Sequence, residues 1–192
     1  TIFNGDPMTC NMKKLMLPDF FQASEVPIVH KFYRNYFKEC YVCGDVDYIF
    51  GPNTAFFDHC EIHSIARVSE EKAYITAAST PAGQEFGLIF SHCRITGEEP
   101  DSVYLGRPWR DCAKTAFICC ELGDHICPEG WQNWGKVRAE VLSDYIEYGN
   151  FGPGADCSGR SPLSRCLVNP EVETYFSKEN VLVGEDGWIP AE

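Results

Sequence analysis

The sequence has no long hydrophobic run and few basic residues, and these two shortages exclude several classes of protein. Its 192 residues contain no stretch of the roughly 18–20 apolar residues that a membrane helix needs. Acidic residues outnumber basic residues 28 to 16, and the resulting net charge of −12 repels phosphate backbones and anionic lipid. We therefore expect neither a nucleic-acid partner nor a membrane partner.

Several motifs of catalytic and metal sites are also missing. The sequence has no G-x-S-x-G, no phosphate-binding loop and no H-E-x-x-H, which argues against a serine hydrolase, a nucleotide-binding enzyme and a zinc protease. Cys40 and Cys43 form one C-x-x-C, but no second pair follows at zinc-finger spacing. His59 and His63 are four residues apart, a weak signal without a helix. We therefore do not expect a zinc site.

What the chain does have is cysteine, 11 residues in all, within an otherwise ordinary globular composition of 44% hydrophobic and 23% charged residues. An odd number cannot be fully paired in disulfides within one chain. A free cysteine behaves as a small hydrophobic residue, so we interpret most of these residues as buried thiols.

Four of the cysteines belong to an internal repeat of the form F-x-x-C-x-[VIL]. The successive cysteines are 20, 33 and 27 residues apart, and the four copies start at Phe37, Phe57, Phe90 and Phe117. The cysteine and the following aliphatic residue are two positions apart and share one face of a strand, whereas the phenylalanine lies on the other face unless a bend intervenes. A constant strand motif with variable spacing is typical of a β-solenoid. A β-sandwich would not need the same triple at corresponding positions, so the sequence predicts an all-β parallel β-helix with an interior cysteine ladder.

We expect a single domain over residues 1–192, with an irregular loop or first turn at 1–30, coils at 31–150 and a C-terminal cap at 151–192. Residues 73–77 and 102–105 are predicted to be further strands. Asn169 followed by Pro170 predicts the start of a short C-terminal helix. Its apolar stripe is expected to cover the open end of the solenoid.

Three clusters of residues could carry chemistry. Asp45 and Asp47 are two apart in an apolar strand, so they would share a face and titrate unequally; alternatively, one is a turn residue and the other is solvated. Arg107, followed by Pro108 and Trp109, could pair with a carboxylate through two hydrogen bonds, or could be a surface arginine. The third cluster is Gly130-Trp-Gln-Asn-Trp-Gly135, whose two tryptophans could simply pack between coils.

The segment G-D-V-D-Y-I-F-G at 44–51, followed by L-G-R-P-W at 105–109, resembles the pectin methylesterases (pectinesterases), in a bacterial-type and N-terminally shortened form. Further family-like motifs keep the family order, and the match runs from about residue 32 to about residue 188. The resemblance implies a right-handed, single-stranded parallel β-helix. It also implies a monomer that binds pectin, or methylated homogalacturonan, as its substrate without metal or cofactor.

The resemblance further implies which residues act. The residue in the position of Asp47 is the nucleophile that attacks the methyl ester, after which methanol leaves and water hydrolyses the acyl-enzyme. The residue in the position of Arg107 hydrogen-bonds and orients that aspartate. Substrate-binding residues lie beside the nucleophile and along the cleft, in the positions of Val46, Phe50, Trp109 and Trp131.

One part of the family pattern is missing. The family carries a Gln-Asp pair on the preceding coil, the aspartate acting as general acid and then base, and the Thr1-Ile2-Phe3 start resembles the tail of that motif. We therefore expect weak or absent activity, unless Asp45 or Asp6 replaces the acid. The alternatives are a non-catalytic carbohydrate-binding β-helix and an unstable fragment. The compartment stays open, because pectin is extracellular whereas unpaired thiols suit a reducing space.

Overall fold

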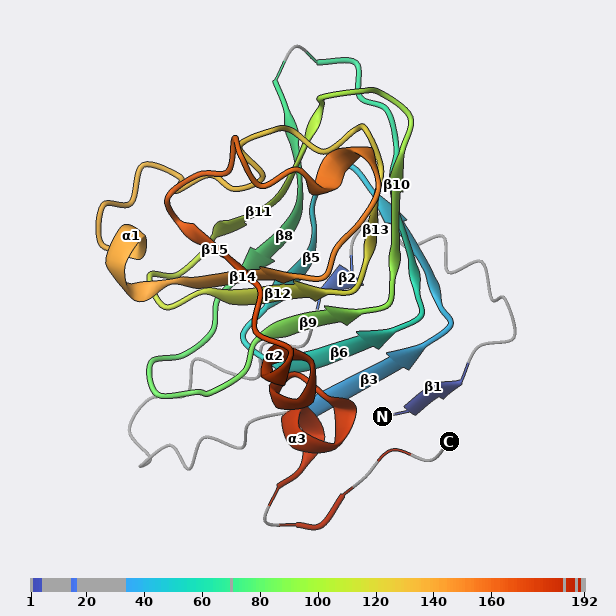
Figure 1. The fold of residues 1–192 in the computed structure, drawn as a ribbon, viewed down its shortest axis with the longest axis vertical. Helices are drawn as coiled ribbons and strands as arrows, with labels where there is room; N and C mark the ends of the chain where they lie inside the picture. Colours follow the sequence, from blue (N-terminus) through green and yellow to red (C-terminus); the bar gives the residue numbers. More distant parts are fainter. Residues whose placement is uncertain are drawn as a thin grey trace.

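The chain winds through three parallel β-sheets in turn and forms a parallel β-helix (Figure 1). The computed structural model describes residues 2–4, 15–16, 34–69, 71–184, 186–188 and 190. Within these residues every pair of neighbouring strands is parallel, and the central coils, which begin at β3 (Arg34–Lys38), β6 (Thr54–Asp58) and β9 (Leu88–Ser91), each contribute one strand to each sheet before the next coil begins. The predicted fold class is confirmed.

In each of the three sheets, strands from successive coils lie side by side. Sheet A contains, in spatial order, β1 (Ile2–Asn4), β3 (Arg34–Lys38), β6 (Thr54–Asp58), β9 (Leu88–Ser91), β12 (Lys114–Ile118), β14 (Asp144–Tyr148) and β15 (Ser164–Leu167). Sheet B contains β13 (Glu121–Leu122), β10 (Arg94–Gly97), β7 (Glu61–Ser64) and β4 (Tyr41–Gly44). Sheet C contains β11 (Val103–Pro108), β8 (Ala73–Ala78), β5 (Val46–Gly51) and β2 (Leu15–Met16).

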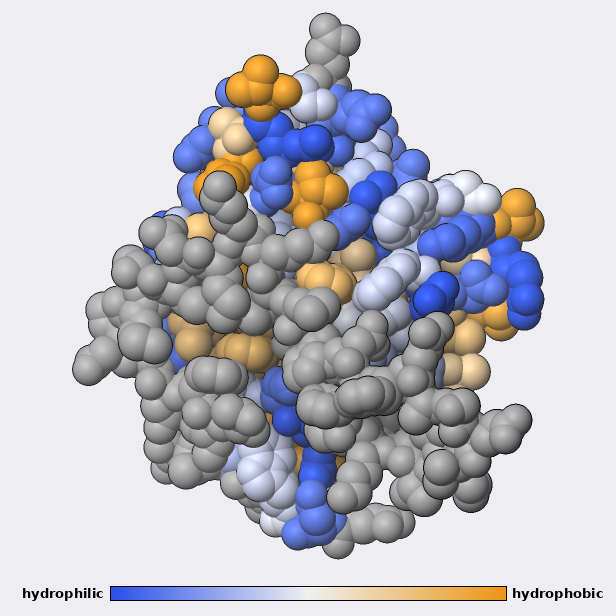
Figure 2. Space-filling view, turned by 180° about the vertical axis from the view of Figure 1, so that it is seen from behind, coloured by the Kyte–Doolittle hydropathy of each residue, from blue (hydrophilic) through white to orange (hydrophobic). Residues whose placement is uncertain are grey.

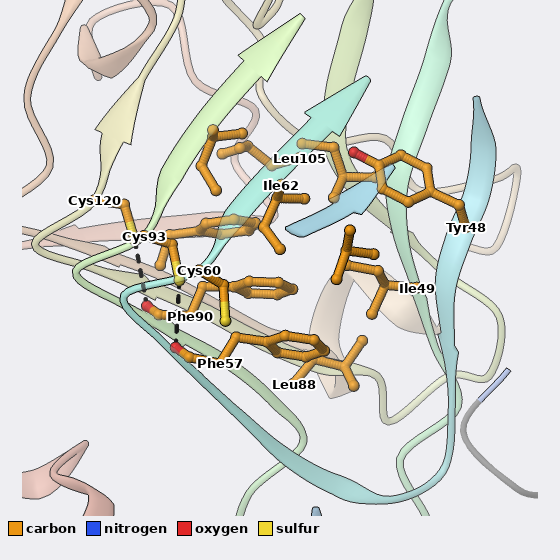
Figure 3. Close-up of a cluster of buried hydrophobic side chains, with 14 of the residues drawn as sticks. Tyr48, Ile49, Phe57, Cys60, Ile62, Leu88, Phe90, Cys93, Leu105 and Cys120 are labelled. Atoms are coloured by element: carbon orange, nitrogen blue, oxygen red, sulfur yellow. Dashed lines mark hydrogen bonds between the residues drawn. The ribbon is translucent and has the colours of Figure 1, made fainter. Parts of the chain in front are cut away.

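The four-fold repeat forms the interior of the solenoid, as Figure 3 shows for its central coils. The phenylalanine rings of successive coils stack nearly parallel, with centroids 4.6, 4.7 and 4.5 Å apart. Beside them the cysteine thiols point back to the preceding coil: the Sγ atoms of Cys60, Cys93 and Cys120 donate to carbonyl oxygens at 3.4, 3.3 and 3.4 Å. The predicted cysteine ladder is confirmed.

A sharp bend explains how phenylalanine and cysteine, three positions apart, face the same interior. The residue before each cysteine has a left-handed backbone, with φ of 52°, 51°, 53° and 53° at Glu39, His59, His92 and Cys119. Each phenylalanine therefore belongs to sheet A, and each following aliphatic residue belongs to sheet B. Left-handed residues are rare outside glycine, so their recurrence marks the corner as a fixed element of the coil.

At β14 an ion pair replaces the aromatic rung. Register places Glu147 next to Phe117, where the repeat would call for another phenylalanine. The Glu147 carboxylate accepts hydrogen bonds from Arg160 at 2.8 and 3.0 Å and from Trp131 Nε1 at 2.9 Å. These side chains are almost entirely buried, so the pairing satisfies both charges at the end of the core. A disulfide joins Cys157, in the segment after β14, to Cys166 in β15, a pairing that the cysteine spacing alone does not predict.

The C-terminal helices cover the outer face of sheet A and not the open end of the solenoid, so that prediction is wrong (Figure 1). The predicted helix is α2 (Glu171–Tyr175), and α3 (Lys178–Leu182) follows it. Phe176, Val181 and Leu182 pack on outward-facing residues of sheet A such as Phe56 and Ile89. Sheet A therefore buries apolar side chains on both faces, and the helices contact its outer face.

The remaining helices are short: α1 (Ala139–Leu142) and the 3-10 turn at Pro153–Ala155. None of the described helices has the length and hydrophobicity needed to cross a membrane. On the side opposite to that of Figure 1, hydrophilic and hydrophobic residues are interspersed over the visible part of the described surface (Figure 2). Apart from the strands β1 and β2, the predicted irregular segment at 1–30 lies outside the described residues.

Candidate active site

The corner that leads into β5 is shaped by a glycine and a tyrosine. A Cβ atom added at Gly44 would lie 2.3 Å from the Cβ of Tyr48, so the tyrosine packs directly over the glycine backbone. The Tyr48 ring is fully buried, and its hydroxyl lies 2.9 Å from that of Ser64. This packing holds in place the short segment that carries Asp45 and Asp47.

Asp47 occupies a bulge at the start of β5. Its backbone is left-handed, with φ of 48°, and the register between β5 and β8 shifts between Val46 and Ile49. Such a bulge takes a residue out of the regular ladder and redirects its side chain. The strand alternation that would place Asp45 and Asp47 on one face therefore does not apply here.

Asp45 has the geometry of a turn residue. Its Oδ1 atom accepts a hydrogen bond from the backbone N–H of Val46 at 2.8 Å. This arrangement matches the alternative interpretation of Asp45 as a turn residue and gives no support to a role as acid. Asp6, the other suggested replacement, lies outside the described residues.

Arg107 projects from β11, on the far side of β8 from Asp47. The register aligns Arg107 with Ala77 and Ala77 with Phe50, so these three residues share one face of sheet C. The small side chain of Ala77 leaves room for the long arginine side chain to cross β8. Gly106 keeps the strands close, because a Cβ there would lie 2.0 Å from the Oγ1 atom of Thr76.

Arg107 and Asp47 form a two-pronged ion pair. Nε donates to Oδ1 at 2.9 Å, and Nη2 donates to Oδ2 at 2.7 Å. The side chains are 16% and 14% exposed, so water screens the pair only in part. This planar, paired geometry fixes both the position and the rotation of the carboxylate.

Two aromatic rings clamp the guanidinium of Arg107. Its Cζ atom lies 3.9 Å from the centroid of the Tyr74 ring and 3.7 Å from that of the Trp134 ring. Tyr74 stacks in turn on Tyr104, with ring centroids 5.1 Å apart. Because cation–π contacts are strongest when water is excluded, the clamp stabilises a single orientation of Arg107.

The other predicted substrate-binding residues divide into two groups. Val46 and Phe50 flank Asp47 on β5, and the Phe50 ring meets the Trp109 ring edge-on at 5.5 Å. All three residues are half-buried, so each retains exposed surface beside the ion pair. The structure therefore brings Asp47, Arg107, Val46, Phe50 and Trp109 together on sheet C.

Trp131 does not join them. Its side chain is 1% exposed, stacks on Tyr145 with centroids 4.3 Å apart, and donates to Glu147. A ring enclosed in this way has no surface on which a sugar could stack, so the prediction of Trp131 as a substrate-binding residue is wrong. The burial supports the alternative interpretation, in which this tryptophan packs between coils.

Comparison with known proteins shows to which family the chain belongs. The pectinesterase family model matches residues 22–185, which is most of the chain. The chain belongs to the pectinesterase family. Pectinesterase 31 of Arabidopsis thaliana is 39% identical over 140 residues, which are 72% of this chain and 43% of the relative.

Solved structures agree with this family. The pectin methylesterase from carrot has a TM-score of 0.71 and 29% identity, covering 78% of this chain and 50% of that one. A pectin methylesterase in complex with a hexasaccharide has a TM-score of 0.68 and 27% identity, covering 82% and 53%. The chain thus spans about half the length of these relatives. Matches in plants, fungi and bacteria do not single out a bacterial type.

The pectinesterase chain has two further residues at the site that the sequence analysis did not assign. Trp134 is 38% exposed and clamps Arg107 because the turn around it is left-handed, with φ of 54°. Lys136 donates to the backbone oxygens of Pro108 and Trp109 at 2.6 and 3.0 Å. Burial lowers the pKa of Lys136 from its ordinary value. The pair of tryptophans was the signal for Trp134, but only the turn geometry shows which of the two contacts Arg107.

Proposed function

We propose that this pectinesterase chain binds methyl-esterified homogalacturonan and carries the nucleophile that removes its methyl esters. The supporting observation is the Asp47–Arg107 pair, which holds one carboxylate in a fixed orientation beside exposed aromatic rings. Each carboxylate oxygen has two lone pairs. After accepting one hydrogen bond from Arg107, each Asp47 oxygen therefore keeps a lone pair for attack.

The proposed reaction has two steps. Asp47 attacks the carbonyl carbon of the ester, and collapse of the tetrahedral intermediate breaks the bond to the methoxy oxygen, which leaves as methanol after receiving a proton from an acid. Water then attacks the resulting anhydride and gives up a proton to the same group, now acting as base. The products are a galacturonate carboxylate, methanol and restored Asp47.

We infer that turnover by this chain alone is weak. Proton transfer and oxyanion stabilisation each contribute roughly 10²-fold or more to such a reaction. Among the residues that the structure describes, the hydrogen bonds of the Asp47 and Arg107 side chains join them to each other and to no second carboxylate. We propose that the acid and the oxyanion donors come from outside the described residues.

The aromatic rings support a pectin chain as the ligand. Phe50, Trp109 and Trp134 offer exposed ring surface around the ion pair, and the apolar face of a sugar ring stacks on such surfaces. A solved relative is a complex with a hexasaccharide, which is consistent with a cleft for several sugar units. We propose that the chain binds the polymer as a monomer.

The same rings favour a second candidate function, a non-catalytic carbohydrate-binding β-helix. Measuring binding of methylated galacturonan oligosaccharides and release of methanol on the same sample separates the two. We expect binding together with slow methanol release, which supports the esterase. Binding without any release would favour the binding module, and the absence of both would refute both proposals.

A further inference from the structure

A group of possible metal ligands lies at the corner between sheets A and B, away from the ion pair on sheet C. His92, Cys119 and Glu173 each present one ligand atom, and these three atoms lie within 4.8 Å of one another. His92 and Cys119 come from neighbouring coils, and Glu173 comes from α2, which packs against the solenoid from outside. No residue of this group takes part in the proposed esterase reaction.

The backbone brings the histidine and the cysteine together. Ser91 and Ile118 are register partners in β9 and β12, and the next residue along each strand, His92 and Cys119, sits at the left-handed corner with φ of 53°. Adjacent strands are about 4.8 Å apart, so equivalent corner residues carry their side chains side by side. The distance between the His92 and Cys119 side chains is therefore set by strand pairing and does not depend on the conformation of a loop.

The histidine ring is already oriented for a ligand. Nδ1 of His92 lies 2.9 Å from the Ser91 hydroxyl, and Nε2 faces the Glu173 carboxylate at 3.9 Å. In the tautomer that donates from Nδ1 to Ser91, Nε2 carries the free lone pair that a metal requires. A hydrogen bond on the distal nitrogen is the usual support of a metal-bound histidine.

We propose that His92, Cys119 and Glu173 bind a divalent transition metal of the zinc type. One thiolate, one imidazole and one carboxylate suit Zn²⁺, which accepts sulfur, nitrogen and oxygen ligands in a tetrahedron, whereas Mg²⁺ and Ca²⁺ prefer oxygen alone. Water fills the fourth position. Zinc–ligand distances of about 2.0–2.3 Å place ligands about 3.5 Å apart, so these side chains must close by about 1 Å.

The exposure of the side chains makes that closure feasible. Those of His92 and Glu173 are 42% and 53% exposed, and Cys119 is half-buried and forms no disulfide. Binding would join α2 to two coils of the solenoid. Metal bound to the folded chain alone raises the melting temperature, which gives a second readout besides the metal itself.

The test uses Co²⁺ as the probe, added to the full chain under nitrogen without thiol reductants. Cobalt bound to a thiolate gives a charge-transfer absorption in the near ultraviolet, and Zn²⁺ should displace it. We expect one equivalent to bind and the band to disappear in Cys119→Ser. The matched control is Cys112→Ser, which removes another half-buried free thiol and should leave the band unchanged.

A second pair of variants tests the histidine. His59 occupies the same left-handed corner one coil earlier and stacks on His92 at 5.1 Å, but lies outside the group. Asparagine tolerates this backbone. We expect His92→Asn to weaken binding by about tenfold or more, in line with the loss of a metal contact, and His59→Asn to change it little. The melting temperature should rise with Zn²⁺ in the wild type and in His59→Asn.

Three results would overturn the proposal. The first is a wild-type chain that gives no cobalt–thiolate band. The second is a band that persists at full strength in Cys119→Ser, which would assign it to another thiol. The third is equal affinity of His92→Asn and His59→Asn for the metal, with circular dichroism showing that both are folded, which would exclude His92 as a ligand.

Discussion

The coupling between Asp47 and Arg107 can be predicted from their contact and burial. Unit charges about 4 Å apart attract by about 4 kcal/mol at an effective dielectric constant of about 20. Desolvation offsets part of this attraction, but the side chains are only 14% and 16% exposed, so screening is limited. We expect a coupling energy of about 2 kcal/mol, between the values of exposed and buried pairs.

A double-mutant cycle measures this coupling. Asp47→Asn keeps the shape of the side chain and tolerates the left-handed backbone, and Arg107→Met keeps most of the aliphatic stem. The four proteins are unfolded in urea and followed by tryptophan fluorescence, which yields the free energy of unfolding for each. The loss in the double variant should be about 2 kcal/mol smaller than the sum of the single losses.

The chain offers a closely matched control pair. Lys72 and Asp101 approach to 2.7 Å, as Arg107 and Asp47 do, and Asp101 is also left-handed with φ of 47°. Their side chains are 34% and 62% exposed, so their coupling should not exceed about 1 kcal/mol. Equal coupling in the two cycles, or less in the Asp47–Arg107 cycle, would show that burial and two-pronged geometry do not strengthen the proposed active-site pair.

Three further predictions concern the core. Burial lowers the pKa of His125 from 6.5 to about 4, so as the pH falls the histidine takes up a proton in the unfolded chain before it does so in the folded chain. The free energy of unfolding should therefore fall by up to about 3 kcal/mol between pH 6.5 and pH 4, and urea titrations of His125→Asn should lack this pH dependence. Phe90→Ala, between two stacked rings, should cost about 3–5 kcal/mol of unfolding free energy in urea, and a loss below 1 kcal/mol would contradict the ladder. Glu147→Gln should cost about 3 kcal/mol or more in the same assay because Arg160 stays buried and charged; an unchanged midpoint would be inconsistent with the buried pair.

The repeat made the solenoid predictable because every coil must present the same residues to the same interior. Phenylalanine and cysteine at constant spacing identified the rungs, and the structure stacks them in the predicted order. The corner itself was less visible. Residue types such as His59 and Cys119 do not by themselves indicate a left-handed backbone. From the sequence, the bend could therefore be inferred only as a requirement for phenylalanine and cysteine to face the same interior.

The active-site geometry was predictable where neighbouring strands fix it and not where a bulge or turn does. Arg107 could be matched to Asp47 because the motif order resembled that of a family, and the structure brings the two together. The bulge at Asp47 broke the alternation on which the pairing with Asp45 depended. Trp131 was predicted to bind substrate, but it is buried and hydrogen-bonded to Glu147, whereas Trp134, in a left-handed turn, contacts Arg107 instead.

The disulfide and the position of the C-terminal helices could not be predicted from the sequence either. Which cysteines pair depends on loops brought together by the last coil, and spacing alone does not select Cys157 and Cys166. The apolar stripe of α2 indicated which helix face is buried but not which surface it meets. Sheet A offered an apolar outer face, and the helix packs there.

Methanol release by Asp47→Asn, compared with Asp45→Asn in the same 192-residue chain, tests whether Asp47 is the nucleophile. Methylated pectin is incubated with each protein, and the methanol formed is measured by gas chromatography over long times. We predict slow release by the wild type, release within about threefold of it by Asp45→Asn, and none above background by Asp47→Asn, because only Asp47 is held by Arg107 for attack. Release that survives in Asp47→Asn would show that Asp47 is not the nucleophile, and release that disappears in Asp45→Asn would show that Asp45 is more than a turn residue.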